Sequence, residues 1–532
     1  METPRVGIPD HLASRMTMPE QHEYLRRKLT RRSALRAGTV TAGAVAGLGV
    51  LGGSANAARH VAQDAPARTA GPSPAFLPSS AASRVDGSLV APFARHLAFG
   101  ADPRTQMTVS WQVPLPVKRP FLRVGTHPWD LSRRIEAEVR ALHTPALTSK
   151  LPAVDQYYLH VGLERLRPDT TYYYGVGHTG FDPADPRNIG TIGSFRTAPS
   201  RPESFTFTAF GDQGVSYDAL ANDALILGQN PSFHLHAGDI CYADSSGQGK
   251  EGDTYDARVW DQFLAQTESV ASKVPWMVTT GNHDMEAWYS PNGYGGQNAR
   301  WSLPKGGLDE EKSPGVYSFV YGNVGVVALD ANDVSLEIKA NTGYTGGAQT
   351  KWLERRLKEL RAHRDVDFVV VFFHHCAFST TNAHASDGGV REAWVPLFDK
   401  YRVDLVVNGH NHVYERTDAL RGGQVGRTVP IGESVSSTRD GIVYVTAGGA
   451  GKALYDFPAP DSYEGHEQHV DSVASYHWTD AGKVTEAVEW SRVRYTGFSF
   501  LAVQVTAGAR PKLEVTALAE TGERVDHFTI TR

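Results

Sequence analysis

The sequence predicts a small all-β domain followed by a larger α/β domain. Between residues 90 and 199, short runs rich in Val, Tyr and Thr alternate with turn residues, and no helical period appears. After Pro202, strand-like runs alternate with helix-like runs, which is typical of α/β architecture. Clusters of Asp, His and Asn follow five of these later strands, so the α/β domain is expected to carry the chemistry.

Length and composition exclude several classes of protein. The chain has 532 residues, a formal net charge of −5 and 41% hydrophobic residues. These values are ordinary for a globular protein and exclude a disordered or collagen-like chain. At about 150 residues per domain, the length predicts two to four domains. Mild acidity argues against a general nucleic-acid binder, and two cysteines cannot form a disulfide framework.

The first 57 residues have the pattern of an export signal. Arg31 and Arg32 precede a Gly- and Ala-rich apolar run at 37–53, and residues 55–57 read Ala-Asn-Ala. This order of charged region, apolar region and small-residue cleavage site predicts a signal peptide. The segment resembles a bacterial twin-arginine leader, which implies the twin-arginine translocase as a partner and a secreted, cell-surface or periplasmic location. The apolar run is too short to span a membrane, and no other span is expected.

Residues 58–88 are predicted to be a linker, and residues 89–199 are predicted to form the β domain. The linker is rich in Ala, Pro and Ser. In the β domain, the runs at 107–111, 157–161 and 171–176 carry the strand pattern. Short strands at this spacing predict a sandwich, which is expected to be a structural support or the contact surface of a homodimer.

Residues 203–490 are predicted to form the α/β domain, and residues 491–532 to add C-terminal strands that complete it. Alternating residues at 499–531 favour this return to the sheet. Residues 418–440 and 452–480 are polar and poorly patterned, which predicts long surface loops. The periodicity predicts strands at 205–210, 232–237, 276–280, 368–373 and 405–407, and helices at 218–227, 258–272 and 348–363.

Five predicted strands each run directly into a polar cluster. Ligands in open α/β sheets bind beyond the carboxyl ends of the strands, so we expect these clusters to converge. They are Gly211-Asp212-Gln213-Gly214, Gly238-Asp239-Ile240-Cys241-Tyr242-Ala243-Asp244, Gly281-Asn282-His283-Asp284, His374-His375 and Gly409-His410-Asn411-His412.

The residue types in these clusters are those of a metal site. Carboxylate, phenolate, amide oxygen and imidazole form a hard-to-borderline set of O and N donors. A carboxylate can bridge two cations, and the number of donors exceeds what one ordinary site needs. Two metals about 3.5–4 Å apart are a common arrangement for phosphoryl hydrolysis, because they neutralise phosphate oxygens and acidify a bound water.

The five clusters resemble the purple acid phosphatases, within the calcineurin-like metallophosphoesterases. The family blocks GDxG, GDxxY, GNH(D/E), VxxH and GHxH occur here in that order, at 211–214, 238–242, 281–284, 371–374 and 409–412. The likeness covers roughly residues 90–532. It implies a fibronectin-III-like N-terminal domain and a catalytic sandwich of two mixed sheets flanked by helices.

The resemblance also implies a division of ligands. Asp212, Tyr242 and His412 would hold the first metal, Asn282, His374 and His410 would hold the second, and Asp239 would bridge them. The phenolate of the tyrosine suits Fe(III) and gives the family its colour. The second metal would be Zn, Mn or Fe(II), and the sequence does not choose among them.

Two further histidines are expected to face the phosphate. His283 follows the Asn282 ligand, and His384 lies ten residues after His374, where plant members place a second such histidine. The implied function is hydrolysis of small phosphate monoesters by a metal-activated hydroxide, with either histidine protonating the leaving oxygen. Two alternatives stay open. One is a secreted phosphodiesterase acting on phospholipid or nucleotide diesters, and the other is an inactive binding protein.

Several neighbouring residues are expected to have structural roles. Side chains alternate along a strand, so only one of His374 and His375 can face the metals, and the VxxH spacing selects His374. His234 and His236 are expected in the core, and Asp244 and Asp284 are expected to orient loops. Cys241 and Cys376 could pair in an oxidising compartment, but buried free thiols are the preferred interpretation. The 294–301 segment is expected to be a loop that walls the substrate cleft.

Overall fold

The computed structural model describes residues 85–249, 254–309 and 311–532. The predicted signal peptide and nearly all of the predicted linker therefore lie outside the described residues. All described residues belong to one unit of the chain.

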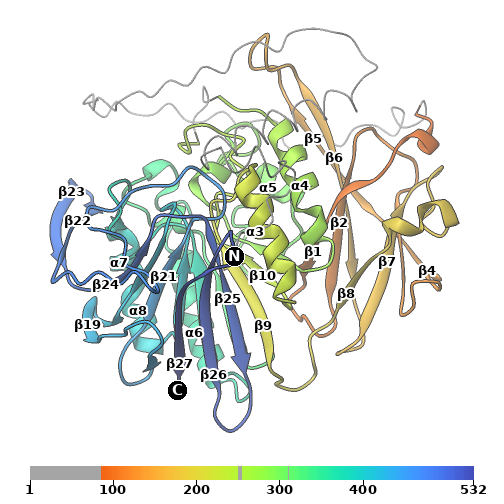
Figure 1. The fold of residues 1–532 in the computed structure, drawn as a ribbon. Helices are drawn as coiled ribbons and strands as arrows, with labels where there is room; N and C mark the ends of the chain where they lie inside the picture. The colour runs from red at the N-terminus through yellow and green to blue at the C-terminus, as the bar shows by residue number, and fades with distance from the viewer. Residues whose placement is uncertain (1–84, 250–253, 310) are drawn as a thin grey trace, which may run out of the picture. The chain divides into compact units, whose positions relative to one another are not determined.

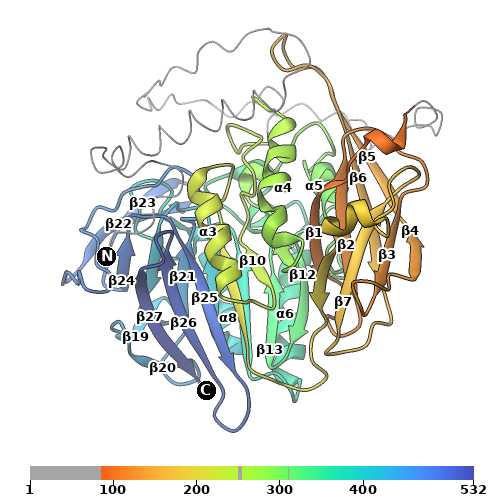
Figure 2. The same ribbon diagram turned by 45° about the vertical axis from the view of Figure 1, so that its right-hand side comes forward.

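The first strands form two four-stranded antiparallel sheets, as the all-β prediction requires (Figure 2). One sheet contains β1 (Phe93–Phe99), β2 (Met107–Val113), β6 (Val154–Leu163) and β5 (Glu138–Thr144), in that order. The other contains β4 (Arg133–Glu136), β3 (Phe121–Gly125), β7 (Thr171–Gly177) and β8 (Gly193–Arg196). Side chains such as Trp111, Leu159 and Tyr174 fill the core between them.

β2 is buried on both faces of its sheet, because the second face packs against the catalytic part of the chain. Every residue of β2 is buried. On this face Gln156 donates to the Ala257 carbonyl at 2.9 Å, and the His160 ring contacts the Ala299 carbonyl at 2.9 Å. The Gln156 amide nitrogen and the His160 ring are thus paired across the junction, which avoids the cost of burying them unsatisfied.

Two seven-stranded mixed sheets form the rest of the fold, confirming the predicted α/β sandwich (Figure 1). The first contains, in order, β11 (Trp276–Val278), β10 (His234–His236), β9 (Phe205–Phe210), β25 (Ser499–Thr506), β26 (Lys512–Ala519), β27 (Arg524–Thr531) and β20 (Ser434–Ser436). The second contains β12 (Tyr317–Tyr321), β13 (Val324–Ala328), β14 (Phe368–Phe373), β16 (Leu405–Asn408), β21 (Val443–Ala447), β17 (Tyr414–Thr417) and β24 (Ser491–Tyr495).

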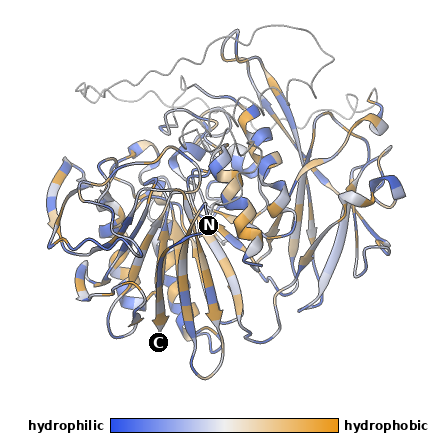
Figure 3. Ribbon diagram, in the orientation of Figure 1, coloured by the Kyte–Doolittle hydropathy of each residue, from blue (hydrophilic) through white to orange (hydrophobic). Residues whose placement is uncertain are grey.

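The two sheets share one hydrophobic core. Phe207 and Val503 of the first sheet and Phe372 of the second belong to the same buried cluster. Figure 3 shows apolar residues along strands of the first sheet such as β25 and β26. β14 reads FVVVFF and is buried throughout, as expected for a parallel strand covered on both faces.

Helices cover the outer faces of the sheets. α3 (Tyr217–Gly228) and α4 (Arg258–Ala271) lie together, and α3 contacts β25. α6 (Ala348–Ala362) contacts β14 and α8 (Val395–Tyr401), and it buries Trp352, Leu353, Leu357 and Leu360 at helical spacing. The remaining helices are α5 (Gly295–Arg300) and α7 (Gly388–Ala393), with short 3-10 turns at Gly87–Leu89, Pro186–Thr191, Asn282–Asp284, Ala331–Asp333 and Lys339–Asn341.

The prediction of long loops at 418–440 and 452–480 is wrong in part. The first segment contains β18 (Ala419–Arg421), β19 (Gln424–Arg427) and β20, and the second contains β22 (Val473–Thr479). β22 pairs with β23 (Gly482–Val488) and with the two-residue strand β15 (Ser386–Asp387). β20 has three residues and pairs with the distant strand β27, so local patterning does not reveal it. β18–β19 and β22–β23 are local hairpins, which the prediction of loops missed.

Candidate metal centre

The five polar clusters follow β9, β10 and β11 in one sheet and β14 and β16 in the other. Within each group the strands run parallel, so their carboxyl ends reach the same edge. Two contacts join the edges of the two sheets: the His410 backbone N–H donates to Asp212 Oδ2 at 2.7 Å, and His374 Nδ1 contacts the Ala237 carbonyl at 2.9 Å. The clusters therefore converge, as the sequence predicts.

Asp212, Tyr242 and His412 form the first group of donors. The Tyr242 hydroxyl donates to Asp212 Oδ1 at 2.9 Å and lies 2.8 Å from His412 Nε2. His412 Nε2 is 3.4 Å from Asp212 Oδ1. The other ring nitrogen, His412 Nδ1, contacts the Ala453 carbonyl at 2.7 Å, which aims Nε2 at the other two donors.

The second group of donors is centred on His374 Nε2 and consists of Asp239, Asn282, His374 and His410. This nitrogen lies 3.2 Å from Asp239 Oδ2, 3.0 Å from Asn282 Oδ1 and 3.2 Å from His410 Nδ1. The donor atoms of Asp239, His374 and His410 lie within 4.8 Å of one another. His374 Nε2 is also 4.0 Å from Asp212 Oδ1, so the two groups adjoin.

The negative charges of the carboxylates in this site favour the binding of cations. Burial opposes a charge on His374, but Asp239 and Asp212 outweigh it and raise the pKa of this imidazole to about 9. Burial, together with the charges of Asp212 and Asp239, raises the pKa of the Tyr242 phenol well above its usual range. Two buried carboxylates beside a phenol and imidazoles supply hard and borderline donors, and a bound cation would draw the proton from the phenol.

The backbone at this site is strained. Among the described residues, Asp212, Asp239, Tyr242 and His410 have φ between 51° and 69°, in the left-handed region that residues with a Cβ rarely adopt. Such conformations cluster at functional sites, where the surrounding structure holds them. Glycine is needed beside them, because a Cβ on Gly281 would collide with Asp239 Oδ1.

The two expected phosphate-facing histidines lie at the same site. The His283 backbone N–H donates to Asp239 Oδ1 at 2.8 Å, and its Nδ1 contacts the Asp244 carbonyl at 2.9 Å. Its ring centroid is 4.6 Å from that of Tyr242. His384 lies with its ring centroid 4.3 Å from that of His410. The structure thus brings together all nine residues singled out from the sequence.

The structure also shows the surroundings of the residues that were expected to have structural roles. His375 is buried, neither of its ring nitrogens has a hydrogen-bond partner, and His374 rather than His375 meets the other donors. His234 is buried and stacks on Trp276 at 4.0 Å. Asp284 accepts from the Gly281 and Ile240 N–H groups, tying two clusters together, and burial and the nearby Asp239 raise its pKa to about 8. Both cysteines are buried and unpaired, as expected.

Three residues of the site escaped the sequence analysis. Glu337 contacts both His410 and His384. Tyr455 stacks on His412, with ring centroids 4.1 Å apart. Lys452 Nζ lies 4.1 Å from the centre of the Tyr242 ring. A signal for Glu337 did exist: β13 is the parallel neighbour of β14, so the chain after Ala328 must emerge at the same edge.

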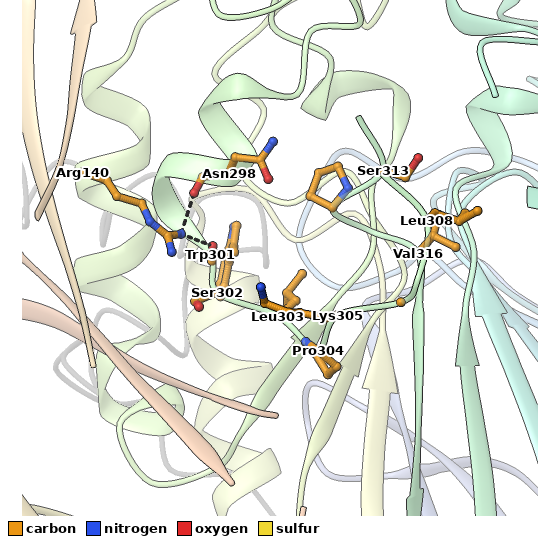
Figure 4. A pocket seen from close by; sticks show the side chains of 12 residues that line it. Arg140, Asn298, Trp301, Ser302, Leu303, Pro304, Lys305, Leu308, Ser313 and Val316 are labelled. Carbon is orange, nitrogen blue, oxygen red and sulfur yellow. Dashed lines mark hydrogen bonds between the residues drawn. The ribbon is translucent and has the colours of Figure 1, made fainter. Parts of the chain in front are cut away.

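The segment at 294–301 is a helix rather than the predicted loop. Its Asn298 and Trp301 line a pocket with Arg140 of β5 and Leu303 (Figure 4). Arg140 donates to the Asn298 and Trp301 carbonyls at 2.7 and 3.0 Å. None of the nine predicted site residues lines this pocket, so it is separate from the candidate metal centre.

Comparison with known families agrees with the geometry. Residues 92–197 match the family described as purple acid phosphatase, N-terminal domain, and residues 205–414 match calcineurin-like phosphoesterase. The chain belongs to the purple acid phosphatase family. An uncharacterized protein of Mycobacterium tuberculosis is 32% identical, over 82% of this chain and 86% of that protein. Purple acid phosphatase 22 of Arabidopsis thaliana is 33% identical, over 48% of this chain and 53% of the relative.

A solved purple acid phosphatase shares the fold. The structure of PPD1 from yellow lupin seeds aligns with a TM-score of 0.63 and 21% identity, over 83% of this chain and 74% of that chain. Membership of the family makes the chain a phosphoesterase hydrolase, with a dinuclear metal centre and small phosphate esters as substrates. Across the described residues, no helix is long and apolar enough to cross a membrane.

Proposed function

We propose that this purple acid phosphatase hydrolyses phosphate monoesters at an Fe(III)–M(II) centre. Tyr242 carries the proposal, because its phenol meets Asp212 and His412 at hydrogen-bond distance in a buried site. A phenolate is a hard donor that suits Fe(III). The proposed ligands are Asp212, Tyr242 and His412 for the iron, Asn282, His374 and His410 for the divalent metal, and Asp239 as the bridge.

Residues around these ligands would bind and orient the phosphate. When bound, the two metals supply positive charge for the phosphate oxygens and acidify a water. The site is flanked by His283, His384 and Lys452, which can donate hydrogen bonds to phosphate oxygens. A monoester has one more ionisable oxygen than a diester, so a site with several hydrogen-bond donors favours it. His283 or His384 would pass a proton to the leaving oxygen.

Two model esters test the substrate class. 4-Nitrophenyl phosphate and bis(4-nitrophenyl) phosphate should be compared on metal-replete protein, from acid to alkaline pH. We expect a higher kcat/KM for the monoester and an optimum at acid pH. Preference for the diester would overturn the monoester proposal in favour of a phosphodiesterase with the same metal centre. Hydrolysis of neither ester by protein that holds metal would favour an inactive binding protein.

Replacing Tyr242 tests the iron. Tyr242→Phe removes the phenol oxygen and keeps the ring, so the visible absorption of the purified protein is expected to disappear. Tyr455→Phe is the matched control, because its hydroxyl meets His384 rather than Asp212, and it should keep the absorption. An unchanged visible spectrum in Tyr242→Phe would refute a tyrosine-ligated iron. Absorption spectra of both variants at equal iron content are the measurement.

We also propose that the chain is exported through the twin-arginine pathway. The support is the sequence alone: Arg31 and Arg32, the apolar run and the Ala-Asn-Ala site at 55–57. N-terminal sequencing of the protein outside the cytoplasm is expected to start at Ala58. Full-length protein confined to the cytoplasm would refute export.

A further inference from the structure

We infer that Glu337 is a positioning residue of the phosphoesterase site, and this inference rests on the proposed function. Its carboxylate joins a proposed metal ligand to a proposed phosphate-facing residue. Glu337 Oε2 lies 2.9 Å from His410 Nε2, and Oε1 lies 2.7 Å from His384 Nδ1. One side chain thus fixes the orientation of two rings whose centroids are 4.3 Å apart.

His410 differs from the other two histidine ligands in this respect. His374 and His412 each turn their second nitrogen to a backbone carbonyl, those of Ala237 and Ala453. His410 turns its second nitrogen to a carboxylate, and its Nδ1 points toward His374 Nε2. A carboxylate behind a metal-ligating histidine fixes the tautomer and raises the basicity of the ligand. Glu337 is therefore expected to strengthen binding of the second metal.

The loop that carries Glu337 is itself held in place. Asp387, three residues after His384, accepts from the backbone N–H groups of Leu336 and Glu337 at 3.1 and 3.2 Å. Its Oδ2 also accepts from the Ser335 hydroxyl at 2.7 Å. The Glu337 side chain is only 9% exposed. A carboxylate so enclosed is ordered before substrate arrives, unlike a solvated ion pair on the surface.

The same contact orients the His384 ring within the site. With Nδ1 on Glu337, the Nε2 atom of His384 faces the Tyr455 hydroxyl at 3.2 Å. Tyr455 stacks in turn on His412, with an interplanar angle of 12°. His384 has a φ of 64°, so its backbone alone would not favour this position. Glu337 thereby acts on the substrate through His384 and on the second metal through His410.

These two routes can be separated by a double-mutant cycle. Glu337→Gln keeps the shape and removes the charge, and it is expected to lower both kcat/KM and the affinity for the second metal by about 10–100-fold. In a His384→Ala background, the same substitution should lower kcat/KM by much less while the loss of metal affinity stays, because His410 is still present. Metal affinity is measured by competition with a chelator, and kcat/KM with 4-nitrophenyl phosphate.

Two further variants make the test specific. Glu337→Asp restores the charge on a shorter side chain and should recover part of the metal affinity. Glu464→Gln removes a similar carboxylate–histidine contact, 3.0 Å from His527 and away from the site, and should match the wild type. Wild-type metal affinity and kcat/KM in Glu337→Gln, or equal losses of kcat/KM in both backgrounds, would overturn the inference alone. A wild-type chain that binds no second metal would overturn the proposed function and this inference together.

Discussion

Asp239→Ala is expected to abolish hydrolysis and the binding of both metals. The Asp239 carboxylate lies between the two donor groups: Oδ2 is 3.2 Å from His374 Nε2, and Oδ1 accepts the His283 N–H at 2.8 Å. Its attraction for His374 and His283 outweighs burial and holds its pKa well below the usual range, which favours the charged carboxylate. Removing it leaves the second group without its only carboxylate.

The expected loss of kcat/KM for Asp239→Ala is at least roughly 10³-fold, since bridged metals supply several kcal/mol of transition-state stabilisation. Asp239→Asn should lose nearly as much, because the amide keeps the shape but not the charge. Asp471→Ala is the control, because this aspartate is 98% exposed and pairs with His469, which is not a proposed ligand. Metal content and 4-nitrophenyl phosphate hydrolysis are measured on each folded variant. Full activity with two metals in Asp239→Ala would refute the proposed bridge.

Arg300→Met is expected to lower the thermal midpoint by roughly 3–5 °C, corresponding to a loss of about 3–5 kcal/mol in a chain of this size. Arg300 Nη1 donates to both carboxylate oxygens of Glu286 at 2.9 Å, and the two side chains are 0% and 1% exposed. Arg300 also contacts the Tyr158 hydroxyl of β6, so the pair joins the β-rich part to the catalytic part. Methionine would leave Glu286 charged, buried and without its cation.

Two variants separate this pair from surface ion pairs. Arg524→Met breaks a pair with Glu464 that is half-exposed, and it should change the thermal midpoint by little. Arg300→Met combined with Glu286→Leu should recover much of the loss, because no unpaired charge remains. Scanning calorimetry measures all three. A midpoint for Arg300→Met equal to that of Arg524→Met would contradict the account.

The architecture could be predicted because its signals are local. β14 is a continuous apolar run, and the buried residues of α6 follow helical spacing, so both elements appear where periodicity places them. β22 was predicted as a loop although it forms a local hairpin with β23. The three-residue strand β20 escaped prediction because it exists through pairing with the distant strand β27. Local sequence carries no record of such partners.

The residues of the candidate site also divide into those that local sequence predicts and those that depend on tertiary contacts. Asp212, Asp239 and His374 could be found because each follows a recognisable strand directly, and strand ends share one edge. Glu337 lies six residues after Ala331, within a loop whose path is set by hydrogen bonds to Asp387. Tyr455 belongs to a segment without periodic pattern. Loop residues of this kind are placed by tertiary hydrogen bonds, which the sequence does not display.

Metal content measured together with activity tests whether the chain is a dinuclear phosphoesterase. The protein, purified without chelators, is analysed by mass spectrometry for metals per chain and assayed with 4-nitrophenyl phosphate before and after chelation. We expect two metal ions per chain. Activity should be lost as the metals are removed and should recover when they are restored. Full hydrolysis by a chain that retains no metal would contradict a dinuclear phosphoesterase.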